Sequence, residues 1–189
     1  MDELFQSTRR MKRSLRAPPG YGIRDARVAD AGALSAVYQS ILEEGRWFAS
    51  FPDELPNTPA WQAGRIRLTQ QDPTGASRIL VAHYGDAVVG GLMLDGESGR
   101  RRRHSAQMEI LLAPPHRGKG LGGALLDGAI AHIEAHPELS RLCLTVFEDN
   151  VAAIALYRSR GFRIEGRRVG SHKELDGRLR TDVLMAWVG

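Results

Sequence analysis

The chain has 189 residues, of which 42% are hydrophobic and 25% charged, as expected for one globular domain with an ordinary core. Its net charge of +4 at pH 7 reflects arginines that cluster near the start and at 100–103, a pattern that favours a solvated surface over a nucleic-acid groove. The single cysteine excludes an internal disulfide, and no apolar run has the length of a transmembrane helix or secretory leader, so we expect a cytoplasmic protein with no membrane or nucleic-acid partner.

Residues 1–19 are polar and basic, and Pro18-Pro19-Gly20 separates them from the rest of the chain. We interpret them as an accessory arm. The acidic Asp2 and Glu3 argue against a transit peptide, because such peptides are poor in acids. The alternative is that the arm packs on a partner subunit, and in that case the protein would form a homodimer. Residues 20–189 are predicted to form one folded domain.

The domain is expected to begin with a strand over 22–28 and a helix capped by Asp30 with apolar residues at helical spacing. Thr58-Pro59 pairs an N-cap with a helix-first proline and predicts a second helix to about residue 71. The loop between these helices is rich in aromatic, acidic and proline residues, so it either builds a substrate pocket or simply packs its aromatic rings beneath it. These aromatic residues are Trp47, Phe48 and Phe51.

The later apolar runs predict, in chain order, strands at 78–84, 87–94 and 106–113, a helix at 118–135, a strand at 141–147, a helix at 151–160, and strands at 162–169 and 180–188. Gly85-Asp86 is a hairpin turn, and Asn150 caps the second of these helices. The step from Met108 through a helix to Val146 predicts parallel strands, whereas the hairpins are antiparallel. The fold class is therefore α/β (an α+β mixed sheet), with a central twisted sheet of six to seven strands and helices on both faces.

The stretch 111–127 joins strand, turn and helix chemistry. An apolar run stops at Pro114-Pro115, and a glycine-rich turn then opens a helix. The first N–H groups of a helix lack intrahelical partners and carry partial positive charge, and glycines let a ligand approach the backbone. Together with the cations Arg117 and Lys119, this turn predicts a phosphate or pyrophosphate site. Close packing of helix on sheet is the purely structural alternative for the glycines.

Two phosphate-binding motifs do not fit this turn. A Walker loop needs Ser or Thr after its lysine, but Gly120 follows Lys119. Gly118, Gly120 and Gly123 match the spacing of the dinucleotide fingerprint. However, that fingerprint belongs near the first strand of a βαβ unit with an acidic residue at a later strand end, and this match lies past the middle of the chain.

The turn motif Arg117-x-x-Gly120-x-Gly122 and the segment 144–162, LTVFEDNVAAIALYRSRGF, resemble two motifs of the GNAT superfamily of acyl-CoA-dependent N-acyltransferases. The resemblance covers Tyr21 to Val188. It implies a GNAT-like fold, acetyl-CoA as cosubstrate with its pyrophosphate on the turn, and a slot between splayed strands where the pantetheine arm pairs with a strand end. No metal site is expected. The cofactor-binding residues implied by the resemblance are Leu111, Leu112, Arg117, Gly118, Lys119, Gly120, Leu121, Gly122, Gly123, Asn150 and Tyr157.

Acetyl transfer to an amine needs a neutral amine, a donor to the oxyanion and a proton for the leaving thiolate. Similar proteins usually attack directly, and the strand context of Cys143 predicts a buried, inert thiol. The backbone N–H of Leu112 is the hypothesised oxyanion donor. Tyr157 is the hypothesised general acid by its family position, or alternatively a core ring with its hydroxyl at the edge. Asn150 caps a helix and, as a further hypothesis, binds the pantetheine.

Glu109 is the hypothesised general base, because it is an acid in an otherwise apolar strand where several relatives carry a catalytic carboxylate. A bulge in that strand would leave its direction undecided. An ordered-water relay is the main alternative. His104 and His116 have suitable intrinsic pKa values but occupy loop positions typical of surface histidines.

The expected acceptor is a primary amine on a small molecule, such as an amino acid, a polyamine-like amine or an antibiotic. Protein or peptide N-termini are one alternative, and a non-catalytic acyl-CoA sensor is another. Asp182 is a candidate for the acceptor pocket. Four further acids could attract a cationic amine or be simply solvated. These are Glu43, Glu44, Asp53 and Glu54.

Overall fold

A computed structural model describes residues 17–54 and 56–189, so most of the predicted arm at 1–19 lies outside the described residues. At its described end, the carbonyl of Pro18 accepts a hydrogen bond from the N–H of Tyr21 at 3.0 Å. Among the described helices, none combines the length and apolar character needed to cross a bilayer.

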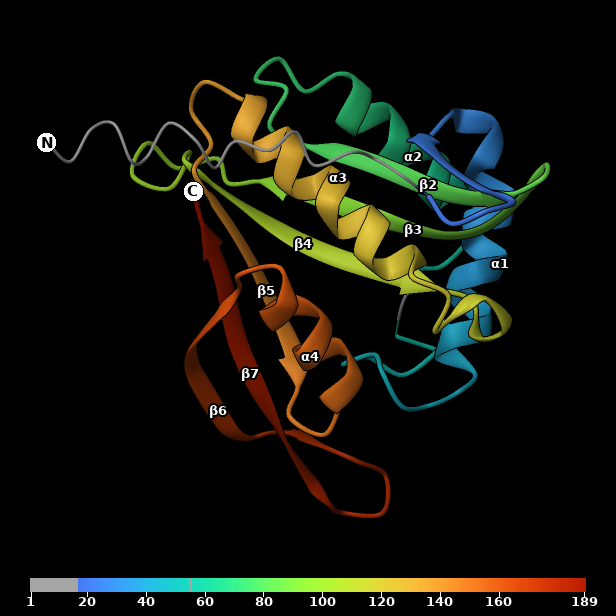
Figure 1. The fold of residues 1–189 in the computed structure, drawn as a ribbon. Coiled ribbons are helices and arrows are strands. Elements are labelled where there is room, and N and C mark those ends of the chain that lie inside the picture. The colour runs from blue at the N-terminus through green and yellow to red at the C-terminus, as the bar shows by residue number, and fades with distance from the viewer. Residues whose placement is uncertain (1–16, 55) are drawn as a thin grey trace, which may run out of the picture.

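Within residues 17–54 and 56–189, strands and helices follow one another in the predicted order (Figure 1). The strands are β1 (Tyr21–Asp25), β2 (Arg78–Tyr84), β3 (Ala87–Gly96), β4 (Ser105–Leu112), β5 (Arg141–Phe147), β6 (Arg163–Lys173) and β7 (Leu179–Val188). The helices are α1 (Ala31–Leu42), α2 (Pro59–Gln70), α3 (Leu121–Ala135) and α4 (Val151–Ser159), with short 3-10 turns at Val28–Asp30 and Pro114–His116.

The strands form one seven-stranded sheet in the order β1-β2-β3-β4-β5-β7-β6. Only β4 and β5 pair in parallel, and the other neighbours are antiparallel. This confirms the predicted mixed sheet, because α3 provides the crossover that a parallel pair requires.

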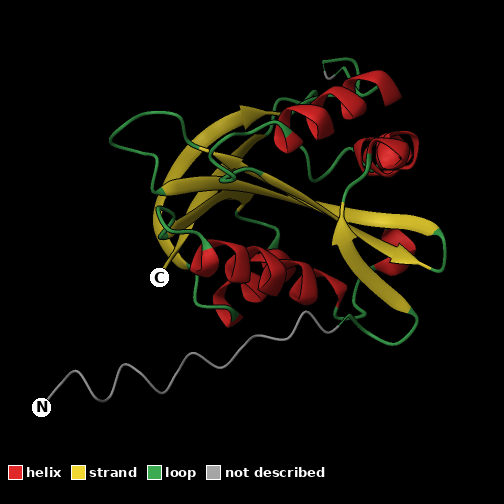
Figure 2. Ribbon diagram, turned by 90° about the horizontal axis from the view of Figure 1, so that it is seen from above, coloured by secondary structure: helices red, strands yellow, loops and turns green. Residues whose placement is uncertain are grey.

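Alternation along the strands divides the core between the two faces of the sheet. Ile79 and Val81 of β2 pack with α1 and α2, whereas Leu80 and Ala82 pack with α3 on the opposite face. Figures 1 and 2 show α1 and α2 on one side of the sheet and α3 and α4 on the other. The helices therefore cover both faces, as predicted.

Three predicted boundaries differ from the structure by three or four residues, and two of them have a local reason. The first strand ends at Asp25 rather than 28, because the carboxylate of Asp30 accepts the N–H of Arg27 at 2.7 Å and bends the chain into a 3-10 turn. The third helix begins at Leu121 rather than 118, because Gly118 and Gly120 have φ of 71° and 83°, which a right-handed helix excludes. The sixth strand continues to residue 173 rather than 169.

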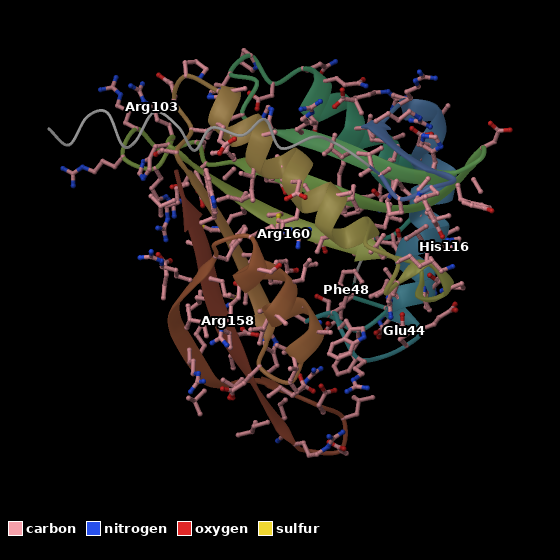
Figure 3. All side chains as sticks on the ribbon, in the orientation of Figure 1. Glu44, Phe48, Arg103, His116, Arg158 and Arg160 are labelled. Carbon is pink, nitrogen blue, oxygen red and sulfur yellow. The ribbon has the colours of Figure 1, made fainter. Side chains whose placement is uncertain are left out.

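The arginine cluster at 100–103 lies in the loop between β3 and β4, at the opposite end of the molecule from Glu44 and His116 (Figure 3). Arg102 pairs with Glu97 at 3.0 Å, and Arg103 pairs with Glu138 at 3.5 Å. Paired, exposed arginines of this kind fit the predicted solvated surface.

Candidate active site

The parallel strands β4 and β5 separate after a short stretch of pairing. They are paired at Ser105 to Gln107 only, opposite Arg141 to Cys143. Beyond this point β4 continues along β3, and β5 continues along β7. The second half of β4 therefore borders an open slot, as the predicted splaying of these strands requires.

The backbone of Leu112 points into this slot. The next N–H, that of Ala113, donates to Val89 of β3 at 3.0 Å, and successive N–H groups of a strand point in opposite directions. The carbonyl of Leu112, which shares the direction of its N–H, accepts from the Nε of Arg117 at 2.9 Å on the side away from β3. The Leu112 N–H is thus directed at whatever occupies the slot.

A cavity of about 480 Å³ lies between this slot and the start of α3. Gly120 is the N-cap of α3, and within the described residues no side-chain hydrogen bond caps the helix start, so its first N–H groups face outward. Most of the predicted cofactor residues line the cavity: Leu111, Leu112, Arg117, Gly118, Gly120, Gly122, Gly123, Asn150 and Tyr157. Two do not: Lys119 is exposed outside it, and the side chain of Leu121 is buried in the core.

The four glycines of the turn serve two different purposes. Gly118 and Gly120 have positive φ, which lets the chain turn into α3. A Cβ on Gly122 would lie 3.1 Å from Leu156, and one on Gly123 would collide with the guanidinium of Arg160. The second pair therefore lies close to side chains of α4 and its C-cap, as the packing interpretation expects, and both residues also line the cavity beside the slot.

Replacing Gly120 by alanine is expected to destabilise the protein by about 1–2 kcal/mol, because its left-handed backbone disfavours a side chain. Urea unfolding measures the change. The matched control is Gly32→Ala in α1, where the added methyl meets nothing within 4 Å and is expected to stabilise by about 0.5–1 kcal/mol. Equal unfolding midpoints for Gly120→Ala and the parent would contradict the assignment.

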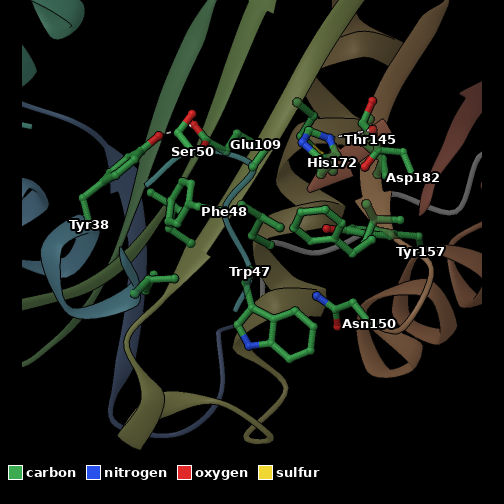
Figure 4. A pocket seen from close by; sticks show the side chains of 18 of the residues that line it. Tyr38, Trp47, Phe48, Ser50, Glu109, Thr145, Asn150, Tyr157, His172 and Asp182 are labelled. Atoms are coloured by element: carbon green, nitrogen blue, oxygen red, sulfur yellow. Dashed lines mark hydrogen bonds and ion pairs between the residues drawn. The ribbon is translucent and has the colours of Figure 1, made fainter. Parts of the chain in front are cut away.

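A larger cavity, of about 680 Å³, lies on the α1 and α2 side of the slot. Trp47 and Phe48 of the α1–α2 loop line it, whereas Phe51 lines a smaller neighbouring cavity. Figure 4 shows Tyr38, Phe48 and Glu109 on one side of the cavity and Tyr157, His172 and Asp182 on the other. The two large cavities share lining residues along the slot, so they lie next to each other. The shared residues are Ile41, Trp47, Ile110, Leu111, Asn150 and Tyr157.

The guanidinium of Arg117 is already paired. Its two terminal nitrogens donate to the carboxylate of Glu44 at 2.7 and 2.5 Å. Glu44 therefore contacts the turn before α3 through Arg117. None of the four acids at 43, 44, 53 and 54 lines the larger cavity. The interpretation of these acids as attractors of the acceptor amine is not supported by their positions.

Glu109 faces this larger cavity. The register of β4 on β3 runs without a shift to Leu112, so the bulge considered from the sequence is absent and alternation places Glu109 on the α1 and α2 face. The hydroxyl of Tyr38 donates to its carboxylate, and Arg65 lies 3.8 Å away. Burial raises the pKa of Glu109 above its usual range, against the opposing effects of Tyr38 and Arg65.

Tyr157 lies where the two cavities meet. It is 6% exposed, and its ring packs against Phe162 with centroids 5.8 Å apart, so it is a core residue as well as a lining residue. Burial, and to a lesser degree the charge of Glu109, raise the pKa of its hydroxyl. The phenol therefore stays protonated at neutral pH.

Asn150 both caps a helix and lines the two large cavities. Its side-chain oxygen accepts the N–H of Ala153 at 3.2 Å, which confirms the predicted cap of α4, and the residue also lines both large cavities. The capping oxygen leaves the amide N–H₂ for other partners.

The histidines considered from the sequence lie outside both large cavities. His116 hydrogen-bonds the hydroxyl of Tyr21 at 3.0 Å, and His104 is an exposed loop residue. Cys143 is half-buried rather than fully buried, and burial raises the pKa of its thiol, which agrees with the prediction of an inert group.

Sequence reasoning missed several residues that the fold brings to the larger cavity. Tyr38 and Arg65 surround Glu109 from α1 and α2, and Arg168 and His172 of β6 surround Asp182. Asp182 itself was predicted to face the acceptor pocket, and it lines the cavity with 2% exposure. Tyr38 and Arg65 are far from Glu109 in the chain, and Arg168 and His172 each follow a register shift in β6. No local sequence pattern marks these four residues.

The fold and the glycine turn beside splayed strands are those that the resemblance to the GNAT superfamily implies, and comparison with known proteins agrees. The acetyltransferase (GNAT) family matches residues 39–162, more than half of the chain. The chain belongs to this family.

Individual relatives show how far the similarity extends. The L-amino acid N-acetyltransferase AaaT of Escherichia coli is 34% identical over 111 residues, covering 59% of this chain but only 65% of that protein. A GNAT-family acetyltransferase structure from Streptococcus pneumoniae has a TM-score of 0.83 and 26% identity, covering 89% of this chain and 99% of that one. A putative acetyltransferase from Salmonella typhimurium, solved with its cofactor acetyl-CoA, has a TM-score of 0.79 and 21% identity, covering 89% and 93%.

Proposed function

We propose that the protein is an acetyl-CoA-dependent N-acetyltransferase that acetylates the primary amine of a small molecule by direct attack. The observation that carries this function is the adjacency of two cavities, one on the donor side and one on the acceptor side, which share Tyr157 as a lining residue. Family membership supports the activity, and the cofactor of the Salmonella structure supports acetyl-CoA as donor.

The donor-side cavity has the features that acetyl-CoA requires. The outward N–H groups at the start of α3 and the positive end of the helix dipole suit a pyrophosphate. The free edge of β4 offers alternating N–H and C=O groups to the amides of the pantetheine arm. Asn150 lies beside this path and can donate its amide to the arm.

Two groups are placed to stabilise the charges that develop on the thioester. The N–H of Leu112 points into the slot, where it can donate to the carbonyl oxygen as it becomes an oxyanion. The hydroxyl of Tyr157, protonated at neutral pH, can give its proton to the departing thiolate. The amine attacks the thioester carbon directly, with no acyl-enzyme.

Glu109 is the proposed general base. Its carboxylate lies in the acceptor-side cavity with 37% of the side chain exposed, and its raised pKa makes it a better proton acceptor than an ordinary glutamate. An ordered-water relay between the amine and Glu109 is compatible with the same role.

The acceptor-side cavity favours a small polar amine. Trp47 and Phe48 enclose it, and it carries acids at Glu109 and Asp182 as well as cations at Arg65 and Arg168. Such a mixture suits a molecule with both an amine and an anionic group, and an amino acid is therefore the favoured acceptor. The activity for which the Escherichia coli relative is named agrees.

A turnover panel tests this function. The protein is incubated with acetyl-CoA and, separately, L-methionine, L-phenylalanine, spermidine, kanamycin or a tetrapeptide with a free N-terminus, and free thiol is measured. We expect release with at least one amino acid. Turnover of the peptide alone would support the N-terminal acetyltransferase, and tight binding of CoA with no turnover would support the sensor.

A further inference from the structure

Asp182 and His172 form a pair on the wall of the acceptor-side cavity opposite Tyr38 (Figure 4). The Nε2 of His172 lies 3.0 Å from a carboxylate oxygen of Asp182. Asp182 is buried, whereas the imidazole is 29% exposed. A buried carboxylate therefore holds a ring that reaches the cavity.

An irregularity in β6 places the imidazole there. Arg168 is opposite Asp182 on β7, but His172 is opposite Arg180, so four residues along β6 correspond to two along β7. Gly170 lies inside this irregularity with a φ of 64°. Bulges of this kind redirect side chains beside active sites, and here the result is that His172 can reach back to Asp182.

The carboxylate selects the tautomer of the ring. A neutral imidazole that donates from Nε2 to Asp182 has no proton on Nδ1, which is then a hydrogen-bond and proton acceptor. The ring of Phe147 packs edge-on against the imidazole with centroids 5.2 Å apart and holds its plane. The ring is therefore oriented as well as accessible.

The chemistry of the proposed function calls for two proton acceptors. An acceptor amine arrives as an ammonium ion, and it must lose one N–H proton before attack and a second as the C–N bond forms. The C–S bond then breaks, the thiolate takes one proton from Tyr157, and the second amine proton returns through water to restore the phenol. The balance for each turnover is one amide, one thiol and one proton released to water.

We propose that His172, oriented by Asp182, is a catalytic residue that takes the first proton from the bound ammonium, and that Glu109 takes the second during C–N bond formation. The inference rests on the proposed function and deepens it. The imidazole Nδ1 becomes protonated, and because the ring is 29% exposed that proton can pass on to solvent. Asp182 stabilises the imidazolium and acts as a positioning residue.

Charged groups from several elements share the surroundings of His172, on both sides of the cavity wall. These groups are Arg168 on β6, Asp182 and Arg180 on β7, Arg46, Lys173 and Glu174 around the adjoining small cavity, and Glu109 and Arg65 across the larger one.

The test compares His172→Gln with the parent protein on the amine that the turnover panel identifies, across pH. Glutamine keeps an N–H for Asp182 but cannot take a proton. We expect kcat/KM to fall by about 10²-fold near neutral pH. The difference in kcat/KM between the parent and the variant should become smaller as the pH approaches the pKa of the amine substrate. An amine that is already neutral does not need the first proton acceptor. A deficit that is constant with pH, or absent, would overturn the proposal.

Two further measurements separate this inference from the proposed function. His104→Gln, an exposed histidine outside the cavities, is the matched control and should leave kcat/KM unchanged. Nitrogen-15 NMR of the free protein reports the tautomer of His172, and we expect the proton on Nε2. A proton on Nδ1 would refute the proposal even without an acceptor, whereas a parent protein that is inactive on the whole panel would refute the proposed function instead.

Discussion

Tyr157→Phe is expected to lower turnover by about 10²- to 10⁴-fold while leaving the affinity for acetyl-CoA nearly unchanged. The substitution removes only the hydroxyl, and the ring that packs against Phe162 and lines both cavities is kept. The leaving thiolate then has no proton donor at the junction of the cavities. Thiol release under saturating substrates gives kcat, and calorimetric titration gives the dissociation constant of acetyl-CoA.

The control for this variant is Tyr84→Phe, since Tyr84 is 54% exposed at the far end of β2 and outside both large cavities. Both variants should unfold at nearly the same temperature as the parent. If Tyr157→Phe retains full turnover, Tyr157 is a core residue alone and the thiolate is protonated by water. A parallel loss of turnover and of acetyl-CoA affinity would show that the hydroxyl acts in binding.

Local chemistry made much of the fold predictable from the sequence. The hydroxyl of Thr58 accepts the N–H of Trp61 at 3.1 Å, and Asn150 caps α4 in the same way. Gly85-Asp86 connects β2 and β3 as expected. In each case a short-range hydrogen bond or a special φ selects the structure, so a few neighbouring residues contain the information.

The acceptor side was less predictable because it is assembled from distant segments. Tyr38 donates to Glu109 across 71 positions of sequence, and nothing near either residue indicates the other. His172 reaches the cavity only because β6 carries two extra residues relative to β7, and periodicity alone cannot locate such an irregularity. The glycine turn could be identified from sequence because its residues are contiguous, whereas the acceptor site has no contiguous motif.

The acids showed how charge alone misleads. For the four acids between the first two helices, attraction of an amine and simple solvation were both possible from the sequence, but Glu44 pairs with Arg117 and none of the four lines the acceptor-side cavity. Glu109 faces the cavity because of its position on an unshifted strand beside Tyr38. Direction and burial, which depend on the tertiary fold, separate a candidate base from a solvated carboxylate.

Glu109→Gln is expected to reduce kcat/KM by about 10²-fold or more and to remove one ionisation from the pH–rate profile. Burial raises the pKa of this carboxyl, and only its ionised form accepts a proton. In the parent, activity should therefore fall as the pH falls through that raised pKa. Glutamine has no such ionisation. The loss of kcat/KM in the variant relative to the parent should therefore be smallest at low pH and persist at high pH.

The persistence of this loss at high pH distinguishes Glu109→Gln from His172→Gln, whose loss should narrow there. The reason is that the second proton must be removed even from an amine that begins neutral. Tyr38→Phe gives an independent check. The Tyr38 hydroxyl stabilises the ionised carboxylate and lowers its pKa, so its loss should move the acidic limb to higher pH. Glu134→Gln on the exposed side of α3 is the matched control. A Glu109→Gln protein with the parent's acidic limb and rate would assign the base role to ordered water.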